Sequence, residues 1–402
     1  MTRVAIHKAT GRGNLKKSVA QLIENLGGIE LVVRPSDAVL VKPNVLTGLR
    51  AETGATVCPE IVEAIVEMCK DSGAGKIVIG EGSNWGVDTL KAFRACGYEE
   101  LAQRCGATLL DLKRDPQVEV AIDDPVHPTI ELPRTIFDVD VVIDVPVLKT
   151  HNQTIVSFSL KNLAVGACSD RMKKSCMHSI CLTSPLSEER RARGSELDYM
   201  IASVSKALPC HLVVVDGFYG MQGNGAPLKG EPANAGILVA GTNRVAVDSV
   251  CARLIGIDPQ KVPHIALSAE RGVGALDIDT IELVGDSVES TRVKFKGSII
   301  EDVEALAPAN VRIVRGNGCY SCVSNFGYFL KQHRAKLEDL GPITFVIGTA
   351  SVPACTGKVV YYGNCAGQEM YGGGFVPGCV PRSRRQVFEA LGIGERYESY
   401  EW

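Results

Sequence analysis

The sequence has no long apolar run, no excess of charge of one sign and no export signal. No stretch approaches the ~18 continuous apolar residues of a membrane-spanning helix, so we expect no membrane segment. The formal net charge is -3, with Lys and Arg spread along the chain, so the composition does not favour a nucleic acid partner. The N-terminus, MTRVAIHKAT, shows no cleavage-site pattern, and we expect a cytoplasmic protein.

Disulfides are also not expected, although the chain of 402 residues contains 14 cysteines. In a large chain without an export signal, cysteines are more often buried thiols, metal ligands or redox groups. Five of them have apolar or helical surroundings and are predicted to be core thiols, namely Cys69, Cys96, Cys105, Cys210 and Cys251.

From residue 1 to about residue 290, short β-branched runs alternate with amphipathic helical stretches. The runs are apolar on both faces, which is typical of a mostly parallel sheet covered by helices on both sides. We therefore predict a large α/β domain over residues 1–304. The predicted strands include 38–41, 76–79, 139–145, 212–215 and 236–240, and the predicted helices include 59–70, 88–95 and 244–254.

A polar and then acidic stretch over residues 288–306 interrupts this pattern, so we place a domain boundary near residue 305. Residues 305–402 are predicted to form a small α/β domain in which cysteines follow strands, where open α/β sheets bind their ligands. Its predicted elements are strands at 311–314, 343–347 and 358–362 and helices at 325–340 and 382–391.

Four cysteines of this domain, Cys319, Cys322, Cys365 and Cys379, are candidate ligands of one metal centre. Soft thiolates select iron–sulfur clusters or zinc. Zinc ribbons usually pair two CxxC motifs, and the chain has one, which disfavours zinc. Zinc ligands or plain buried thiols are the alternative to a cluster. Cys355 is an alternative third ligand, but Cys365 has glycine-rich surroundings whose N–H groups can point at sulfide.

The cysteine motifs come in the order CxxC, Gly-x-Cys-Ala and Pro-Gly-Cys, at residues 319–322, 363–366 and 377–379. In this order the domain resembles the cluster-binding domain of NiFe-hydrogenase small subunits and of a related NADH:quinone oxidoreductase subunit. The resemblance implies a flavodoxin-like sheet that holds one 4Fe-4S cluster through the four cysteines. Val380 stands where that family often has proline, beside a ligand rather than at one.

Polar residues of the large domain gather where predicted strands end. A lysine at such a position can act as base or nucleophile, a histidine can move protons or bind a metal, and several lysines can hold a phosphate or carboxylate. Taken singly, each of these residues is more often structural; as a group they are expected at one edge of the sheet. They are Lys42, Asn44, Lys149, His151, Lys161, Asn162, His178, Asp216, Gly217 and Asp248.

The same stretches resemble the domain-of-unknown-function 362 family over residues 35–280. The matching pieces are the KPN turn, the KTH and LKN segments, the VVDG strand end with its GNGAPLKG loop, and AVDSVCARLIG. The resemblance implies the fold and a site but leaves the reaction open. Members often carry ferredoxin-like iron–sulfur segments, which agrees with the interpretation of the C-terminal cysteines.

His151, Lys161 and His178 are similar in spacing to a segment of lactate-racemase-type enzymes, at intervals of ten and seventeen residues. That similarity implies a nucleotide-like nickel cofactor on Lys161, with histidine as metal ligand and as acid/base. The upstream Asp-x-x-Arg motif of those enzymes is not evident, since Cys58 precedes Pro59 where arginine is expected. Three cysteines flank His178 and suggest a second metal or redox site, namely Cys168, Cys176 and Cys181.

The glycine-rich loop of residues 80–86 follows a predicted strand, but its glycine spacing departs from the dinucleotide-binding pattern. It is kept as a candidate substrate loop only.

We predict an iron–sulfur oxidoreductase of anaerobic metabolism that acts on a small anionic substrate or cofactor, with an electron-transfer protein as a candidate partner. The predicted catalytic residues are Lys149, His151, Lys161, His178 and Asp216; the predicted cofactor-binding residues are Lys42, Asn44, Asn162, Gly217 and Asp248; the predicted ligands of a 4Fe-4S cluster are Cys319, Cys322, Cys365 and Cys379. Two alternatives stay open, a non-catalytic electron-transfer or cluster-carrier protein and a metal-dependent racemase or epimerase.

Overall fold

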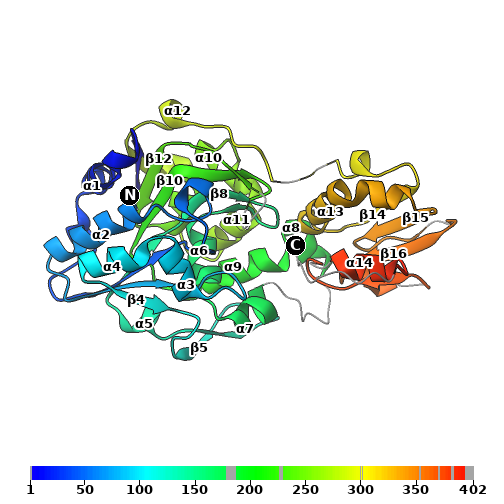
Figure 1. Ribbon diagram of the computed structural model, residues 1–402, viewed down its shortest axis with the longest axis horizontal. Helices are drawn as coiled ribbons and strands as arrows, with labels where there is room; N and C mark the ends of the chain where they lie inside the picture. Colours follow the sequence, from blue (N-terminus) through cyan, green and yellow to red (C-terminus); the bar gives the residue numbers. More distant parts are fainter. Residues whose placement is uncertain are drawn as a thin grey trace. The chain divides into compact units, whose positions relative to one another are not determined.

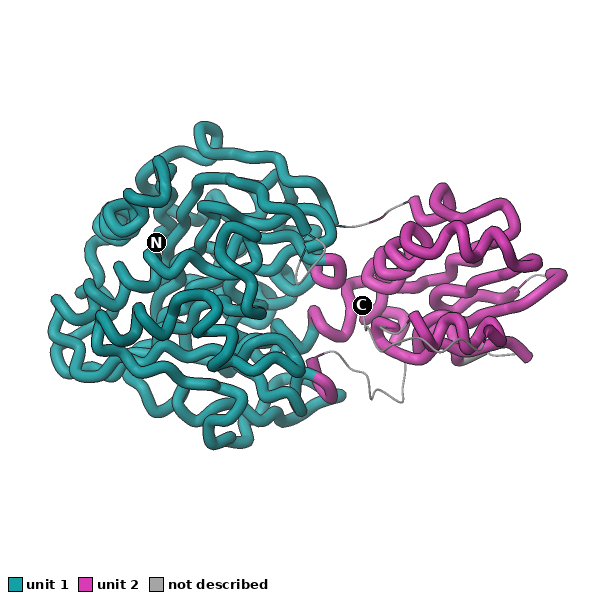
Figure 2. The backbone as a smooth tube through the Cα atoms, viewed as in Figure 1, with its two compact units in different colours: residues 1–151, 155–173, 199–298 teal, residues 152–154, 174–198, 299–402 magenta. Residues whose placement is uncertain are grey.

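The computed structural model describes residues 2–177, 187–225, 230–298, 300, 302–352, 355–369, 372–381 and 384–393. The chain forms two compact units (Figures 1 and 2). Unit 1 comprises Met1–His151, Ile155–Lys173 and Tyr199–Ser298, and unit 2 comprises Asn152–Thr154, Lys174–Asp198 and Ile299–Trp402. Both are α/β, which confirms the predicted fold class. In the part of the chain that is described, no helix is both long and apolar enough to cross a membrane.

The sheet of unit 1 has the order β13-β1-β12-β10-β7-β2-β3-β4 along its main path. Strands β10, β7, β2, β3 and β4 run parallel, whereas β12 is antiparallel to both of its neighbours. The strands of unit 1 are β1 (Thr2–Lys8), β2 (Ala38–Pro43), β3 (Lys76–Glu81), β4 (Thr108–Asp111), β5 (Gln117–Ala121), β6 (Thr129–Pro133), β7 (Val141–Val145), β8 (Val147–His151), β9 (Ile155–Ser157), β10 (Leu212–Gly223), β11 (Gly230–Pro232), β12 (Ile237–Gly241) and β13 (Ile281–Gly285).

Helices connect the parallel strands and cover the sheet. Several begin at a residue that favours a helix start: Pro59 opens α2, and the Asn243 side chain accepts a hydrogen bond from the Ala246 amide at the start of α10. The helices are α1 (Leu15–Leu26), α2 (Pro59–Asp71), α3 (Thr89–Ala95), α4 (Tyr98–Cys105), α5 (Thr135–Asp138), α6 (Ser159–Gly166), α7 (Asp170–Met172), α9 (Glu196–Ala207), which begins in unit 2, α10 (Arg244–Leu254), α11 (Pro263–Glu270) and α12 (Val288–Thr291).

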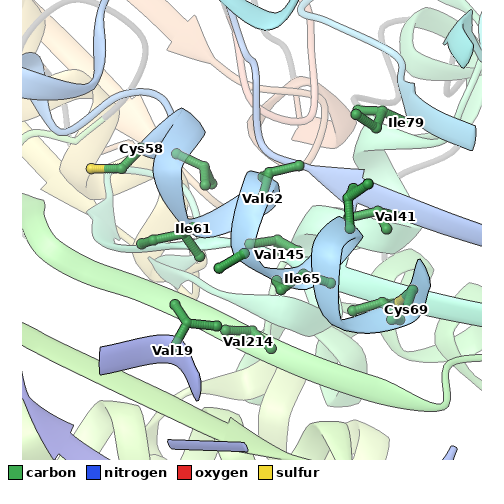
Figure 3. Packing of buried hydrophobic residues seen from close by; sticks show 14 of the residues in the cluster. Val19, Val41, Cys58, Ile61, Val62, Ile65, Cys69, Ile79, Val145 and Val214 are labelled. Carbon is green, nitrogen blue, oxygen red and sulfur yellow. The ribbon is translucent and has the colours of Figure 1, made fainter. Parts of the chain in front are cut away.

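The core of unit 1 lies between α2 and the parallel strands. Ile61 and Ile65 of α2 pack in one buried cluster with Val41 and Val145 of strands β2 and β7 (Figure 3). Burial of each such side chain contributes about 1.5–3 kcal/mol. Cys69 lies in the same cluster, as predicted for a core thiol. Because parallel strands β7, β2, β3 and β4 are fixed by this core, their carboxyl ends meet at one edge of the sheet.

Unit 2 has a four-stranded sheet within the described residues, with strands β14 (Val311–Arg315), β15 (Ile343–Ile347), β16 (Lys358–Tyr362) and β17 (Gly374–Val376). All are parallel and lie in chain order, so this sheet shows no reversal of strand order of the kind that marks a flavodoxin-like sheet. Its helices are α8 (Glu188–Arg193), α13 (Tyr320–Glu338) and α14 (Arg384–Ala390). The aromatic residues Phe326, Phe329, Phe345 and Phe388 form its core.

Unit 2 also contains two stretches from earlier in the chain, residues 152–154 and 174–198. The Tyr320 hydroxyl lies 2.9 and 3.1 Å from the two carboxylate oxygens of Asp198 and 2.8 Å from the Gln153 carbonyl oxygen. The Ser321 hydroxyl donates to the same carbonyl. Asp198 and Ser321 are fully buried, so these bonds satisfy groups that water cannot reach. The first turn of α13 is therefore held by residues far from it in sequence.

Whether residues 305–402 fold on their own, as the predicted boundary implies, stays a prediction that a fragment can test. A fragment of residues 305–402 keeps its phenylalanine core but leaves the Tyr320 and Ser321 hydroxyls without Gln153 and Asp198. We expect native-like hydrogen-exchange protection in β14 to β16 and a loss of protection over residues 317–325, relative to the full chain. Equal protection of that segment in both proteins would contradict this.

Candidate functional site

Polar side chains of unit 1 converge at the carboxyl edge of its parallel strands. Lys42 lies near the end of β2 and Asn44 follows that strand directly. Glu81 ends β3, and Asp144 is the next-to-last residue of β7. Asn162 joins them from α6. All five are buried, with exposed fractions of 7% or less. The predicted convergence of Lys42, Asn44 and Asn162 is thus present, and Glu81 and Asp144 belong with them.

Lys42 forms a buried ion pair with Glu81. Its Nζ atom also donates to the Asn162 side-chain oxygen at 3.0 Å and to the Pro43 carbonyl at 3.3 Å. These three acceptors use all three protons of a charged amine. Lys42 is 0% exposed and Glu81 1%, so either charge alone would be costly to bury. We infer that Lys42 organises the site and is not available to a ligand.

Two asparagines relay hydrogen bonds across the site in one direction. The amide nitrogen of Asn44 donates to the side-chain oxygen of Asn162 at 2.9 Å, and the amide nitrogen of Asn162 donates to Asp144 at 2.7 Å. The remaining oxygen of Asn44 accepts from the Nζ atom of Lys149 on β8. Each amide orientation is therefore fixed by a cation on its oxygen and an acceptor on its nitrogen.

Two titratable side chains of this network have shifted pKa values. Burial lowers the pKa of Lys149 to about 7; Glu81 opposes the shift and Lys42 adds to it. Burial raises the pKa of Asp144 to about 6, although Lys42 and the hydrogen bond from Asn162 oppose the change. Lys149 and Asp144 thus both change charge close to neutral pH, which suits groups that exchange protons with a ligand.

Lys173 extends the site along the edge toward β4. Its Nζ atom donates to the carbonyl oxygens of Gly82 and Ser83, in the loop after β3. Burial lowers the pKa of Lys173 to about 8, opposed by Glu81. The loop packs tightly here, since a Cβ on Gly82 would lie 2.4 Å from the Gly166 carbonyl oxygen.

Sequence reasoning did not assign Asp144 or Lys173 to the site, and it included Glu81 only within the candidate substrate loop of residues 80–86. Glu81 carried the same signal as Asp216, an acidic residue at the end of a predicted strand, and could have been found by it. Lys173 carried none, because it lies outside the strand ends, where Lys173–Met177 form a single turn of π-helix after α7.

Asp216 and Asp248 lie elsewhere and bind backbone amides. The Asp216 carboxylate accepts from the Cys58 amide at 2.7 Å and the Phe218 amide at 2.9 Å. Asp248 accepts from the amides of Ser159 and Leu160, so it caps the first turn of α6 and positions Asn162 on that helix. Burial raises the pKa of Asp216 and brings that of Asp248 to about 8. Their roles as catalytic and binding residues stay predictions.

Gly217 lies in a tight place between strands, since a Cβ there would be 2.7 Å from the Ile237 carbonyl oxygen. His151 ends β8, where it pairs with Ile155, and its carbonyl accepts from the Ser298 hydroxyl at 2.9 Å. Lys161 is 8% exposed and lies on α6 beside Asn162. His178 and Cys181 lie outside the described residues, so the predicted His–Lys–His arrangement and the second metal site stay predictions.

Gly86, the last residue of the candidate substrate loop, lines a cavity of about 260 Å³ beside Asp111 at the end of β4. Its charged lining is already paired: Lys113 binds Asp170 at 3.0 Å, and Arg114 lies 3.5 Å from Asp111. A cluster of Glu63, Glu67 and Cys105 has the spacing of a metal site, but Lys16 pairs with both of its carboxylates. Arg104 also pairs with Glu63 at 2.9 Å, so Lys16 and Arg104 together balance the two glutamates without a metal.

The four predicted cysteine ligands lie in unit 2, three of them on loops that follow parallel strands and Cys322 in the first turn of α13. Cys319 precedes α13 after β14, Cys365 follows β16 by three residues, and Cys379 follows β17 by three. The last two loops are joined, because the Gly378 amide donates to the Asn364 side chain at 2.7 Å and the Asn364 amide to the Gly378 carbonyl at 3.1 Å.

The thiols act on one another. A hydrogen bond from the Cys322 thiol lowers the pKa of Cys319, and donating that bond, together with burial, raises the pKa of Cys322. Burial, followed by the charges of Cys319 and Cys365, raises the pKa of Cys379. A Cβ on Gly363 would lie 3.3 Å from the Cys322 sulfur, so the glycine keeps the Cys365 loop close to the CxxC turn.

Cys355 occupies the other edge of this sheet. It precedes β16 by three residues, and the neighbouring Lys358 amide donates to the Pro342 carbonyl at 2.9 Å, where β15 begins. The two ends of five-residue β16 are separated by roughly 13 Å. The order of strands and loops therefore favours Cys365 over Cys355 as the partner of the CxxC turn.

Comparisons with known proteins give one family and several relatives. A family model described as Domain of unknown function (DUF362) matches residues 39–253. The chain is 30% identical over 261 residues to a thylakoid-associated protein of Synechocystis sp., covering 65% of this chain and 76% of that protein. The lactate racemase apoprotein from Thermoanaerobacterium thermosaccharolyticum has a TM-score of 0.38 at 12% identity, over 86% of this chain and 69% of that one. A Thermotoga maritima protein has a TM-score of 0.35 at 11% identity, over 65% and 60%.

Replacing Lys42 and replacing Lys149 should have different effects on the free energy of unfolding. Lys42→Met leaves Glu81 buried without a partner, and we expect a loss of about 3–5 kcal/mol in the free energy of unfolding. Lys149→Met removes a buried amine that has no ion-pair partner within the described residues, and we expect little loss or a gain. Denaturant unfolding of both variants at neutral pH measures this, and equal destabilisation would contradict it.

The effect of Lys149→Met should depend on pH. The folded-state pKa of Lys149, about 7, lies below its ordinary value of 10.5, so the folded protein bears the cost of a buried charge fully below pH 7. That cost fades as pH rises from 7 to 10.5. The variant's stability relative to the native protein should therefore be greatest below pH 7 and decrease above it, as measured by unfolding curves across this range. A difference independent of pH would contradict the assignment.

Proposed function

The chain belongs to the family described as Domain of unknown function (DUF362), and we propose that it is an iron–sulfur oxidoreductase acting on a small anionic substrate. The observation that carries the proposal is the mutual interaction of Cys319, Cys322, Cys365 and Cys379, which lie on segments that follow strands at one edge of the unit 2 sheet. Thiols that affect one another in this way are candidates to share a single metal centre.

The donor set supports an iron–sulfur cluster. Four thiols from three separate loops can surround one centre, and three of them are less than 10% exposed, which keeps water from the ligands. Gly363 and Gly378 have φ angles of +93° and +133°, conformations that glycine adopts most easily, so their loops can turn sharply beside the thiols. A bound 4Fe-4S cluster would supply one-electron chemistry at this position.

The backbone amide of Glu196 supplies a further contact, since its hydrogen bond to Cys379 lowers the pKa of that thiol against the larger effect of burial. Amide donors to ligand sulfur stabilise added negative charge and so set the reduction potential of a cluster. Residues 195–198 would thus belong to the proposed redox site together with the four cysteines.

The polar network of unit 1 supports an anionic substrate. Lys149 and Lys173 are buried amines, with exposed fractions of 3% for both, and neither has an ion-pair partner within the described residues. In the proposed reaction these amines hold the substrate's negative charge. Asp144 and Lys149 hold or release a proton near neutral pH, because their pKa values are about 6 and about 7.

The first experiment tests the cluster. Protein purified without oxygen should contain about four iron and four sulfide per chain and show charge-transfer absorbance. Cys365→Ser should lose most of the iron, whereas Cys355→Ser should retain it, because only Cys365 lies at the ligand edge of the sheet. Zinc in place of iron, or loss of iron in the Cys355 variant alone, would refute the proposed site.

The second experiment separates an enzyme from an electron carrier. Reduced protein is mixed with small carboxylic and oxo acids, and reoxidation is followed by absorbance. An enzyme should be reoxidised by a specific acid, and Lys149→Met should slow this step by about tenfold or more while reoxidation by a soluble dye is unchanged. Reoxidation by dyes alone, equal in both proteins, would favour a non-catalytic electron carrier in the cytoplasm.

A further inference from the structure

The three buried lysines of the unit 1 network differ in how many of their protons are already bound. Lys42 has three acceptors: Glu81, the Asn162 side chain and the Pro43 carbonyl. Lys173 has two, both backbone carbonyl oxygens. Lys149 has one, the neutral side-chain oxygen of Asn44. A charged amine has three protons to donate, so Lys149 has the largest unmet capacity within the described network.

The burial of Lys149 makes this capacity significant. The side chain is 3% exposed, so solvent does not complete its hydrogen bonds. The charged groups that act on it are Glu81 on β3 and Lys42 on β2, and Glu81 is already paired with Lys42. Burying an amine that has one neutral acceptor costs free energy, and a structural role alone does not offset that cost. Such a group is expected where a ligand supplies the missing anion.

The network's charge limits what that anion can be. Lys42 and Glu81 cancel, and with both amines protonated Lys149 and Lys173 exceed Asp144 by a single positive charge. One N–H group of Asn44 and one of Asn162 are occupied by neighbours. One excess charge suits a monoanion, whereas a phosphate dianion requires more positive charge.

We propose that Lys149 anchors the substrate through a single carboxylate group, donating its two free N–H bonds to that group. This inference rests on the proposed function in assuming an anionic substrate, and it narrows that substrate to a small monocarboxylate. The carboxylate supplies the counter-charge that the amine lacks. Lys42, Asn44 and Asn162 are positioning residues, because they hold the Lys149 amine without touching the ligand.

A consequence of this arrangement is proton uptake on binding. At about pH 8 the free amine is mostly neutral, and the carboxylate favours its charged form, so binding should draw close to one proton from the buffer. Of the neighbouring titratable groups, Glu81 and Lys42 are locked in their ion pair, and Asp144 is separated from Lys149 by the two asparagines. Lys173, whose pKa is about 8, also titrates at this pH, so the Lys149→Met variant decides which of the two amines takes up the proton.

The test is calorimetric titration of the full chain with acetate, glyoxylate, pyruvate and inorganic phosphate, in two buffers of different ionisation enthalpy at about pH 8. We expect at least one monocarboxylate to bind with uptake of about one proton, and phosphate to bind about tenfold more weakly or not at all. Lys149→Met should weaken carboxylate binding by about tenfold or more and abolish proton uptake. Lys91→Met, an exposed control on α3, should bind as the native protein does.

The possible results separate this inference from the proposed function. No monocarboxylate binding, tighter binding of phosphate, or native affinity in Lys149→Met overturns the anchor. A covalent adduct on Lys149 after borohydride treatment with an oxo acid also overturns it, by showing a nucleophile instead. Iron content is measured on the same samples: carboxylate binding by iron-free protein refutes the proposed redox function and leaves the anchor standing. A retained cooperative unfolding transition of Lys149→Met, measured on the same samples, shows that the variant keeps its fold.

Discussion

The ion pair between Lys42 and Glu81 is the constraint on which the rest of the unit 1 site depends. Both charges are buried at adjacent strand ends, so neither can be lost without exposing the other to an apolar interior. The pair fixes the Lys42 amine, which fixes the oxygen of Asn162, and that amide in turn orients Asn44. Asn44 accepts a hydrogen bond from the amine of Lys149 and so fixes its position. An ion pair that contacts no ligand thereby sets the position of the amine that we propose as the ligand anchor.

Parallel sheets explain why both proposed sites could be located from sequence. In each unit the loops that follow parallel strands return to one edge, so residues far apart in the chain converge without any specific pairing between them. Predicted strands at 38–41, 76–79, 311–314, 343–347 and 358–362 each lie within an observed strand. The positions of Lys42, Asn44, Cys319 and Cys365 at the carboxyl edges follow from these strands, whereas Cys379 follows β17, which was not among the predicted strands.

Side-chain direction could not be predicted in the same way. Asp216 and Lys42 carried the same sequence signal, yet the carboxylate of Asp216 turns to the amide of Phe218, two residues on, and to that of Cys58, which folding brings near it. Lys173 comes from a short helical turn that has no periodic pattern of its own. Helix α13 begins five residues before the predicted start, at Tyr320, because Asp198 and Gln153 from distant segments hold its first turn. In these cases a contact between residues far apart in the sequence contributes to the side-chain direction or the start of the helix, and the local sequence pattern does not contain that contact.

Unit 2 is assembled from three separate stretches of the chain, and this affects how it can be inherited. The four proposed cysteine ligands all lie after residue 318. Gln153 and Asp198, which hold the first turn of α13, lie within the region matched by the DUF362 family model. A gene fusion that moved only the C-terminal segment to another protein would transfer the thiols without their braces. The cysteine unit is therefore expected to be inherited together with this family's core rather than exchanged as a portable module.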